Sequence, residues 1–148
     1  MSAPTGKASR RETFHFLMMA DQSLYHKLLM RKLAGSELTI GQPKVLEYLA
    51  EHDGANQKDI AADCYIEPAT LTTTLNGMES RGLVERRRLN GNRKNYYVFL
   101  TDRGRAKYAL VEQAFEEMET ETFACFTEEE KAAFMELFGK VSRRIHEL

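Results

Sequence analysis

The sequence predicts a mainly α-helical protein that carries one small β-hairpin, and two observations predict it. Apolar residues recur at intervals of three and four positions over most of the 148 residues, which is the spacing of amphipathic helices. One Asn-Gly pair, Asn90-Gly91, separates two β-prone runs, a strong hairpin signal. No apolar run approaches the ~18 residues needed to span a bilayer. A cytoplasmic protein with no membrane partner is therefore expected.

The first helix is expected over residues 10–33, where Ala34-Gly35 ends it. A second helix is expected to close near Glu51, with Thr39 as its N-cap. Asp53-Gly54 then indicates a turn. The apolar stripes of these two helices are Phe14, Leu17, Met18, Leu24, Tyr25 and Leu28 in the first, and Val45, Leu46 and Leu49 in the second.

Two further helices follow with a tight connection between them. The shorter one runs from about Asn56 to Cys64, with Ile60 and Ala61 inward. Glu67-Pro68 opens the next, because proline and an acidic residue suit the first helical turn. Its inner stripe is Leu71, Leu75 and Met78, and Arg81-Gly82 ends it. The opposite face carries short side chains without an acid among them: Ala69, Thr70, Thr72, Thr73 and Asn76.

The predicted hairpin joins Leu83–Arg88 to Tyr96–Leu100, and its tip is basic at Arg93 and Lys94. Thr101-Asp102 caps a long helix that reaches about Ala124. Thr127 and Glu130 have the spacing of a capping box and begin the last helix. The inward residues expected in these two helices are Ala106, Leu110, Ala114, Phe115 and Met118, and then Phe134, Leu137, Phe138, Val141 and Ile145.

A short helix, a tight connection, a helix with a polar face and a basic hairpin together make a winged helix-turn-helix. The charge distribution fits that interpretation. The whole chain carries a net charge of −1, but residues 67–107 carry nine basic and four acidic side chains. Attraction to phosphate depends on the charge of a surface rather than of a chain. Short polar groups on residues 67–81 would approach base edges closely. Duplex DNA is therefore the expected partner.

The arginine run is expected to divide between two sides of a strand, with Arg86 and Arg88 on one side and Arg87 on the other. The two cysteines, Cys64 and Cys125, are too few for a disulfide framework and are interpreted as structural thiols. His15 and His26 lie eleven residues apart, about 16 Å along a helix, too far to bind one metal ion. Neither a metal site nor a cofactor is expected.

From about Phe14 to His146 the sequence resembles the MarR family of bacterial transcription regulators. The matching stretches are Leu38-Thr39, Val45-Leu46 and Leu49, Asn56–Ala61, Ala69–Thr72, Leu75, Met78-Glu79, Arg81–Arg86 and Leu100–Gly104. The tip of the hairpin departs from the family pattern Asp-x-Arg, because Asn92-Arg93-Lys94 stands there. Lysine lacks the planar fork of arginine, so either Arg93 or Lys94 could be the groove-entering cation. Thr73 stands where the family commonly has a basic residue.

The resemblance implies a single domain over residues 1–148. Residues 10–33 and 105–148 would form dimerisation helices, and residues 39–104 a winged DNA-binding head. It implies a homodimer on a pseudo-palindromic operator, with residues 67–81 in the major groove and the hairpin tip in the flanking minor groove. It further implies a repressor released by a small aromatic or anionic effector.

The residues expected to contact DNA are Pro68, Ala69, Thr70, Thr72, Thr73, Asn76, Arg86, Arg88, Arg93 and Lys94. The alternative is a winged-helix protein-interaction module without DNA binding, which would have no need for the positive segment. An enzyme is disfavoured, because the sequence offers no nucleophile–base pair, phosphate-binding glycine loop or paired catalytic carboxylates.

Overall fold

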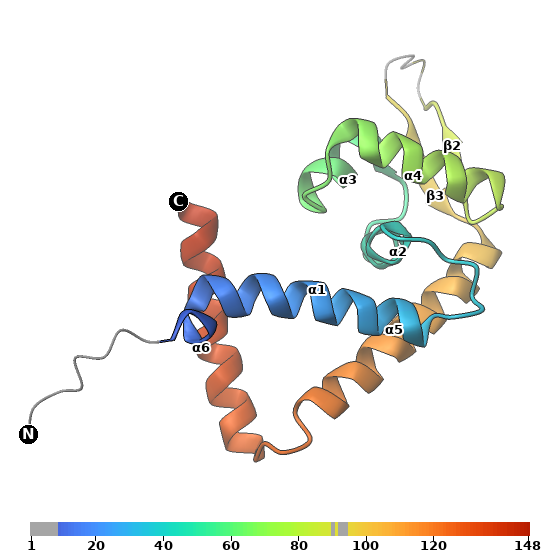
Figure 1. Cartoon of the computed structure of the whole chain (residues 1–148). Coiled ribbons are helices and arrows are strands. Elements are labelled where there is room, and N and C mark those ends of the chain that lie inside the picture. Colours follow the sequence, from blue (N-terminus) through green and yellow to red (C-terminus); the bar gives the residue numbers. More distant parts are fainter. Residues whose placement is uncertain (1–8, 90, 92–94) are drawn as a thin grey trace, which may run out of the picture. The chain divides into compact units, whose positions relative to one another are not determined.

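A computed structural model describes residues 9–89, 91 and 95–148, and it confirms a mainly helical chain with a small antiparallel sheet (Figure 1). The chain divides into two compact units, with the boundary after Ala114. Unit 1 comprises the described residues up to Ala114, and unit 2 comprises residues 115–148. The boundary falls inside one long helix, α5, which spans Asp102–Thr122.

Unit 1 begins with a short 3-10 helix, Arg10–Glu12, followed by α1, Phe14–Lys32. Sequence spacing predicts one continuous helix here, but the extended backbone of Thr13 separates the two elements. The predicted apolar stripe of α1 is present but not buried within the chain. Phe14, for example, is 52% exposed, and Leu29 is the buried residue of the helix.

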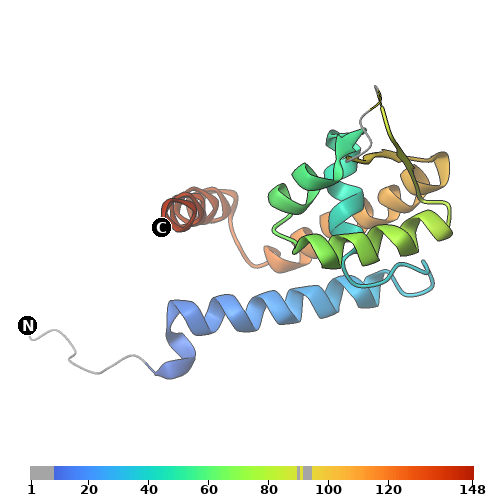
Figure 2. The same cartoon turned by 90° about the horizontal axis from the view of Figure 1, so that it is seen from above.

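Three helices form the centre of unit 1: α2, Gln42–Glu51; α3, Gln57–Asp63; and α4, Pro68–Ser80 (Figure 2). The predicted core is confirmed, because one set of apolar side chains is completely buried: Val45, Leu46, Leu49, Ile60, Leu71, Leu75 and Met78. The predicted N-cap of α2 is wrong. Gly41, with φ 90°, precedes the helix instead of Thr39, since the left-handed backbone there favours glycine.

The sheet has three strands in the order β1-β3-β2, all antiparallel: β1, Ala55–Asn56; β2, Val84–Arg87; and β3, Tyr97–Leu100. The hairpin β2–β3 confirms the predicted wing and extends beside α4 (Figure 1). Strand β1 was not predicted, because two residues carry no periodicity. Its edge is fixed by two backbone bonds, from Gly54 N–H to Val98 O at 2.8 Å and from Gln57 N–H to Tyr96 O at 2.9 Å.

Helix α5 begins as predicted at a Thr101 cap, whose hydroxyl oxygen accepts the Gly104 N–H at 3.0 Å. Two of its predicted inward residues are wrong: Ala106 and Leu110 are exposed, and Val111 is buried instead. Gly104 explains why α5 turns a different face inward from the predicted one. A side chain there would overlap the Leu83 carbonyl oxygen, so this point of α5 lies directly against the backbone. Residues seven positions apart share a helix face, which places Val111 on the same side.

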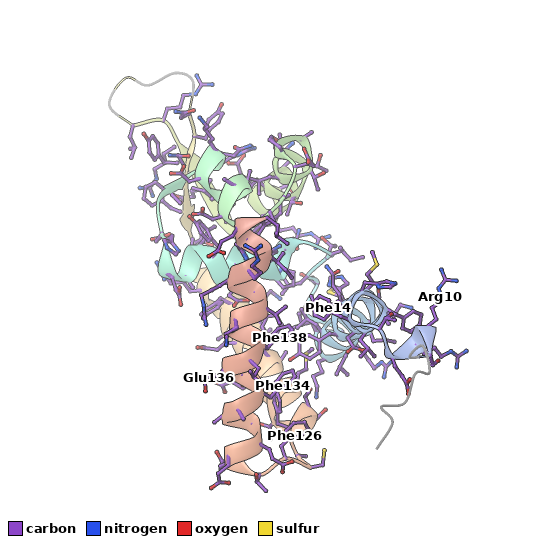
Figure 3. The ribbon with its side chains drawn as sticks, turned by 90° about the vertical axis from the view of Figure 1, so that its left-hand side faces the viewer. Arg10, Phe14, Phe126, Phe134, Glu136 and Phe138 are labelled. Atoms are coloured by element: carbon purple, nitrogen blue, oxygen red, sulfur yellow. The ribbon has the colours of Figure 1, made fainter. Side chains whose placement is uncertain are left out.

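Unit 2 contains the end of α5 and helix α6, Glu128–Glu147. The predicted capping box of Thr127 and Glu130 is present. An aromatic cluster of Phe123, Phe126, Phe134 and Phe138 links the connection to α6, with ring centroids 5.2–6.4 Å apart. Figure 3 shows Phe126, Phe134 and Phe138 along one side of the unit, with Glu136 on the other side of α6. No residue of α6 is buried within the chain.

Candidate nucleic-acid interface

The polar face of α4 is exposed, as its pattern predicts. Pro68, Ala69, Thr70, Thr72, Thr73 and Asn76 all lie on the solvent side of the helix, opposite its buried stripe. Two of the threonine hydroxyls donate to the carbonyls one turn back, Thr72 to Pro68 O at 3.0 Å and Thr73 to Ala69 O at 3.2 Å. Each hydroxyl oxygen still has lone pairs that can accept a hydrogen bond, and at Thr72 one of them accepts from Gln57.

Gln57, the first residue of α3, belongs to the same surface and was not predicted to act there. Its side-chain Nε2 donates to the Thr72 hydroxyl oxygen at 2.8 Å. A hollow of about 270 Å³ lies beside this contact, between α3, the start of α4 and the two residues just before β3. It is lined by Gln57, Lys58, Ala61, Pro68, Leu71, Thr72, Asn95 and Tyr96. The sequence feature that could have indicated this role is that α3 begins with a polar residue.

Arg86 connects the hairpin to α4. Its guanidinium donates to both carboxylate oxygens of Glu79, with Nε at 3.2 Å and Nη2 at 3.1 Å. Nη2 also donates to Oδ1 of Asn76 at 2.7 Å. The hydrogen bond and charge of Arg86 lower the pKa of Glu79 against a smaller opposing effect of burial. Arg86 thus orders the two elements of the candidate interface relative to each other.

The predicted alternation of the arginines is observed. Arg86 and Arg88 lie over the Tyr96 ring, at 5.5 Å and 4.7 Å from its centroid, and Arg88 also donates to the Tyr96 hydroxyl oxygen at 2.7 Å. Arg87 lies over the Phe99 ring at 4.5 Å and pairs with Glu85. The two other predicted contacts, Arg93 and Lys94, lie outside the described residues.

The two cysteines differ in exposure, because Cys64 is buried and Cys125 is exposed. Burial raises the pKa of the Cys64 thiol, and nearby Asp63 and Glu47 raise it further against the opposing effect of Lys44. Among the described residues no group of three or more His, Cys, Asp and Glu could hold a metal ion. In the same part of the chain, no helix has both the length and the apolarity needed to cross a membrane.

We expect Cys64 to resist modification, because the reactive species is the thiolate and both burial and pKa disfavour it. In a Cys125→Ser variant, a disulfide reagent at pH 8 should react at least about a hundredfold more slowly with the native protein than with the urea-unfolded protein. Equal rates in the two states would show an accessible, activated thiol and would contradict this prediction.

Helix α3, the connection after it, helix α4 and the β2–β3 hairpin together define a winged helix-turn-helix protein. The sequence model of the MarR family matches residues 38–96. The regulator YwoH of Bacillus subtilis, an uncharacterized HTH-type transcriptional regulator, is 31% identical over 126 residues, which cover 84% of this chain and 91% of YwoH. The chain belongs to the MarR family of transcription regulators.

Solved structures share the fold over nearly the whole chain. The crystal structure of MarR superposes with a TM-score of 0.84 at 23% identity, covering 96% of this chain and 97% of that one. The S. aureus MepR–DNA complex superposes with a TM-score of 0.79 at 24% identity, covering 93% and 99% of the two chains. At these identities the likeness concerns the fold.

Proposed function

We propose that this regulator acts as a homodimer that binds a specific double-stranded DNA sequence through α4 and the β2–β3 hairpin. The observation that carries the proposal is the exposed face of α4, which presents short side chains from Pro68 to Asn76, while the acid beside them, Glu79, is paired with Arg86. The MepR complex, which shares this fold, contains DNA. In the same arrangement α4 would enter the major groove and the hairpin tip the flanking minor groove, with half-sites about one helical turn, ~34 Å, apart.

Positive charge is concentrated where the phosphates would lie. Residues 67–107 carry a net charge of +5, whereas residues 108–148 carry −6. Arg88 is exposed beside Tyr96, and Arg93 and Lys94 follow at the hairpin tip. These three cations supply the sequence-independent attraction, while Thr70, Thr72, Thr73 and Asn76 face the bases.

Homodimerisation is supported by apolar side chains that the single chain leaves exposed. They lie in α1, where Met19 is 70% and Leu24 is 62% exposed, and in α6, where Leu137 is 62% and Ile145 is 46% exposed. Two long helices with exposed apolar faces fit the terminal dimerisation helices of residues 10–33 and 105–148. Each subunit would then present one winged head to one half of a pseudo-palindrome.

We further propose that the protein is a cytoplasmic repressor without catalytic activity, released from DNA by a small aromatic or anionic molecule. Membership of the MarR family supports this, because many of its members are repressors of that kind. Such release requires that the effector bind the DNA-free arrangement of the dimer more tightly than the DNA-bound one.

The wing provides the first test. We expect the double substitution Arg93→Ala and Lys94→Ala to weaken binding to all DNA sequences alike. Loss of two phosphate contacts in each subunit, four per dimer, should flatten the dependence of log Kd on log salt by up to about 3.6. Fluorescence anisotropy over a salt series measures both effects, with an Arg143→Ala variant as the control, because Arg143 is exposed in α6 and shares the helix face of Glu136. An unchanged affinity and slope would exclude the wing from the interface, and no binding at low salt by the unmodified protein would favour the protein-interaction alternative.

A further inference from the structure

The amide of Asn76 has one permitted orientation in this structure. Arg86 Nη2 lies 2.7 Å from its Oδ1. The two ends of an asparagine amide are commonly distinguished only by their hydrogen-bond partners. A guanidinium has five donors and no acceptor, so the atom that faces Arg86 must be the carbonyl oxygen. The NH2 group of Asn76 consequently points away from Arg86, on the exposed side of α4.

Arg86 is itself held in place by Glu79 and Tyr96, so the orientation that it imposes on Asn76 is part of the folded structure. Glu79 accepts from the Arg86 backbone N–H at 3.3 Å as well as from its side chain. The guanidinium also lies over the Tyr96 ring. The side chain of Arg86 is only 15% exposed. Rotating Asn76 would place its NH2 group against the donating Nη2 of Arg86, so the hydrogen bond would be lost and two donors would face each other.

An amide that offers donors selects among base edges. In the major groove, guanine presents two acceptors, N7 and O6, whereas adenine presents N7 and the N6 donor, and cytosine presents the N4 donor. Asparagine reads adenine by accepting from N6 through Oδ1 while it donates to N7. In this chain one of the two lone pairs of that oxygen already accepts from Arg86, so the amide recognises a base mainly through its NH2 donor. Guanine offers that donor two acceptors, N7 and O6, whereas adenine offers N7 alone and thymine O4 alone.

We propose that Asn76 is a specificity-determining residue that selects guanine at one position of each half-site, and that Arg86 and Glu79 position it rather than contact phosphate. The proposal rests on the DNA binding proposed above and adds to it the identity of a base and of the residues behind it. Arg86, expected from the sequence as a DNA contact, then acts through Asn76.

The isosteric variant Asn76→Asp separates this role from a structural one. Aspartate keeps an oxygen for Arg86 but replaces the NH2 donor by an acceptor. Carboxylates accept from cytosine N4, so the preferred base should change from guanine to cytosine at one position and stay the same elsewhere. The added negative charge should lower affinity for every site, so the ratio of affinities is the informative quantity. Asn76→Ala should lose the preference without acquiring a new one.

Selection from a randomised duplex library with the full-length protein, followed by measurement of Kd on the selected sites, tests the proposal. We expect at least a roughly tenfold preference for guanine with the unmodified protein and its reversal to cytosine with Asn76→Asp. Selection of the same base at every position by both proteins overturns the assignment while leaving the proposed DNA binding intact. If the unmodified protein enriches no sequence, the proposed function itself fails, and the assignment fails with it.

Arg86→Gln tests the positioning role. We expect the guanine preference to fall about tenfold while the slope of log Kd against log salt stays unchanged. A phosphate contact, lost once in each of the two subunits, would instead flatten the slope by about 1.8 without altering the preference. Glu79→Gln, which leaves Arg86 in place but removes the charge opposite it, should relax the preference to a smaller extent. The Glu79→Gln variant replaces Arg86→Gln as the test if the latter protein does not fold. An unaltered preference in both variants would overturn the positioning role.

Discussion

Gly104→Ala is expected to lower the free energy of unfolding by about 3 kcal/mol, the upper part of the range for overpacking a buried site. Gly104 lies in the first turn of α5, where a Cβ would overlap the Leu83 carbonyl oxygen and lie 3.2 Å from Leu100 Cδ2. That carbonyl oxygen accepts the Thr101 N–H at 3.1 Å. The Leu83 carbonyl therefore cannot move away without breaking its hydrogen bond to Thr101, the residue between β3 and α5.

The measurement is urea denaturation followed by circular dichroism at a fixed protomer concentration, since oligomerisation makes apparent stability concentration-dependent. Gly77→Ala is the matched control. Gly77 also lies within a helix, but the nearest atom to its Cβ would be Gln42 Nε2 at 3.5 Å, an ordinary contact. Alanine is the better helix former by about 0.5–1 kcal/mol, so this variant should be slightly stabilised. Equal effects at the two positions would show that Gly104 is not in close contact.

Periodicity predicted the order of the helices and the core of unit 1 because those residues repeat over several turns. The stripe Leu71, Leu75 and Met78 is an example, and each of these side chains is completely buried. Where the structure depends on one close contact between two backbone segments, the periodicity of the sequence could not predict it. Gly104 rotates α5 so that Val111, and not Leu110, is inward, and its contact with Leu83 joins residues far apart in the sequence.

The candidate interface was predicted as a set of exposed residues but not as a network. Spacing placed Thr72 and Asn76 on one face, and alternation placed Arg86 and Arg88 on one side of β2. The bond from Gln57 to Thr72 spans 15 residues, and the bond from Arg86 to Asn76 spans 10. Such partners depend on how the strand and the helices pack. A polar side chain that bonds to another side chain and one that bonds to water look the same in the sequence.

Leu137→Asp is expected to convert the protein from dimer to monomer and to weaken operator binding by at least about a hundredfold. Leu137 is 62% exposed in the single chain and lies within α6, so an aspartate there should cost the protomer little. In a two-fold symmetric dimer the substitution occurs twice in one interface. Burying an unpaired carboxylate costs several kcal/mol. Without the dimer each head binds its half-site alone and loses the effective concentration of a linked pair.

Analytical ultracentrifugation and anisotropy on the operator measure the two consequences, and a thermal melt checks that the protomer remains folded. Ala132→Asp is the matched control, because it adds the same charge to the same helix. Glu136 lies on the side of α6 opposite Phe134 and Phe138 (Figure 3). Ala132 stands four residues before Glu136 in α6 and therefore shares that side. It should remain dimeric and bind DNA as the unmodified protein does. A Leu137→Asp protein that stays dimeric would remove this face of α6 from the interface and with it the proposed role of the last helix.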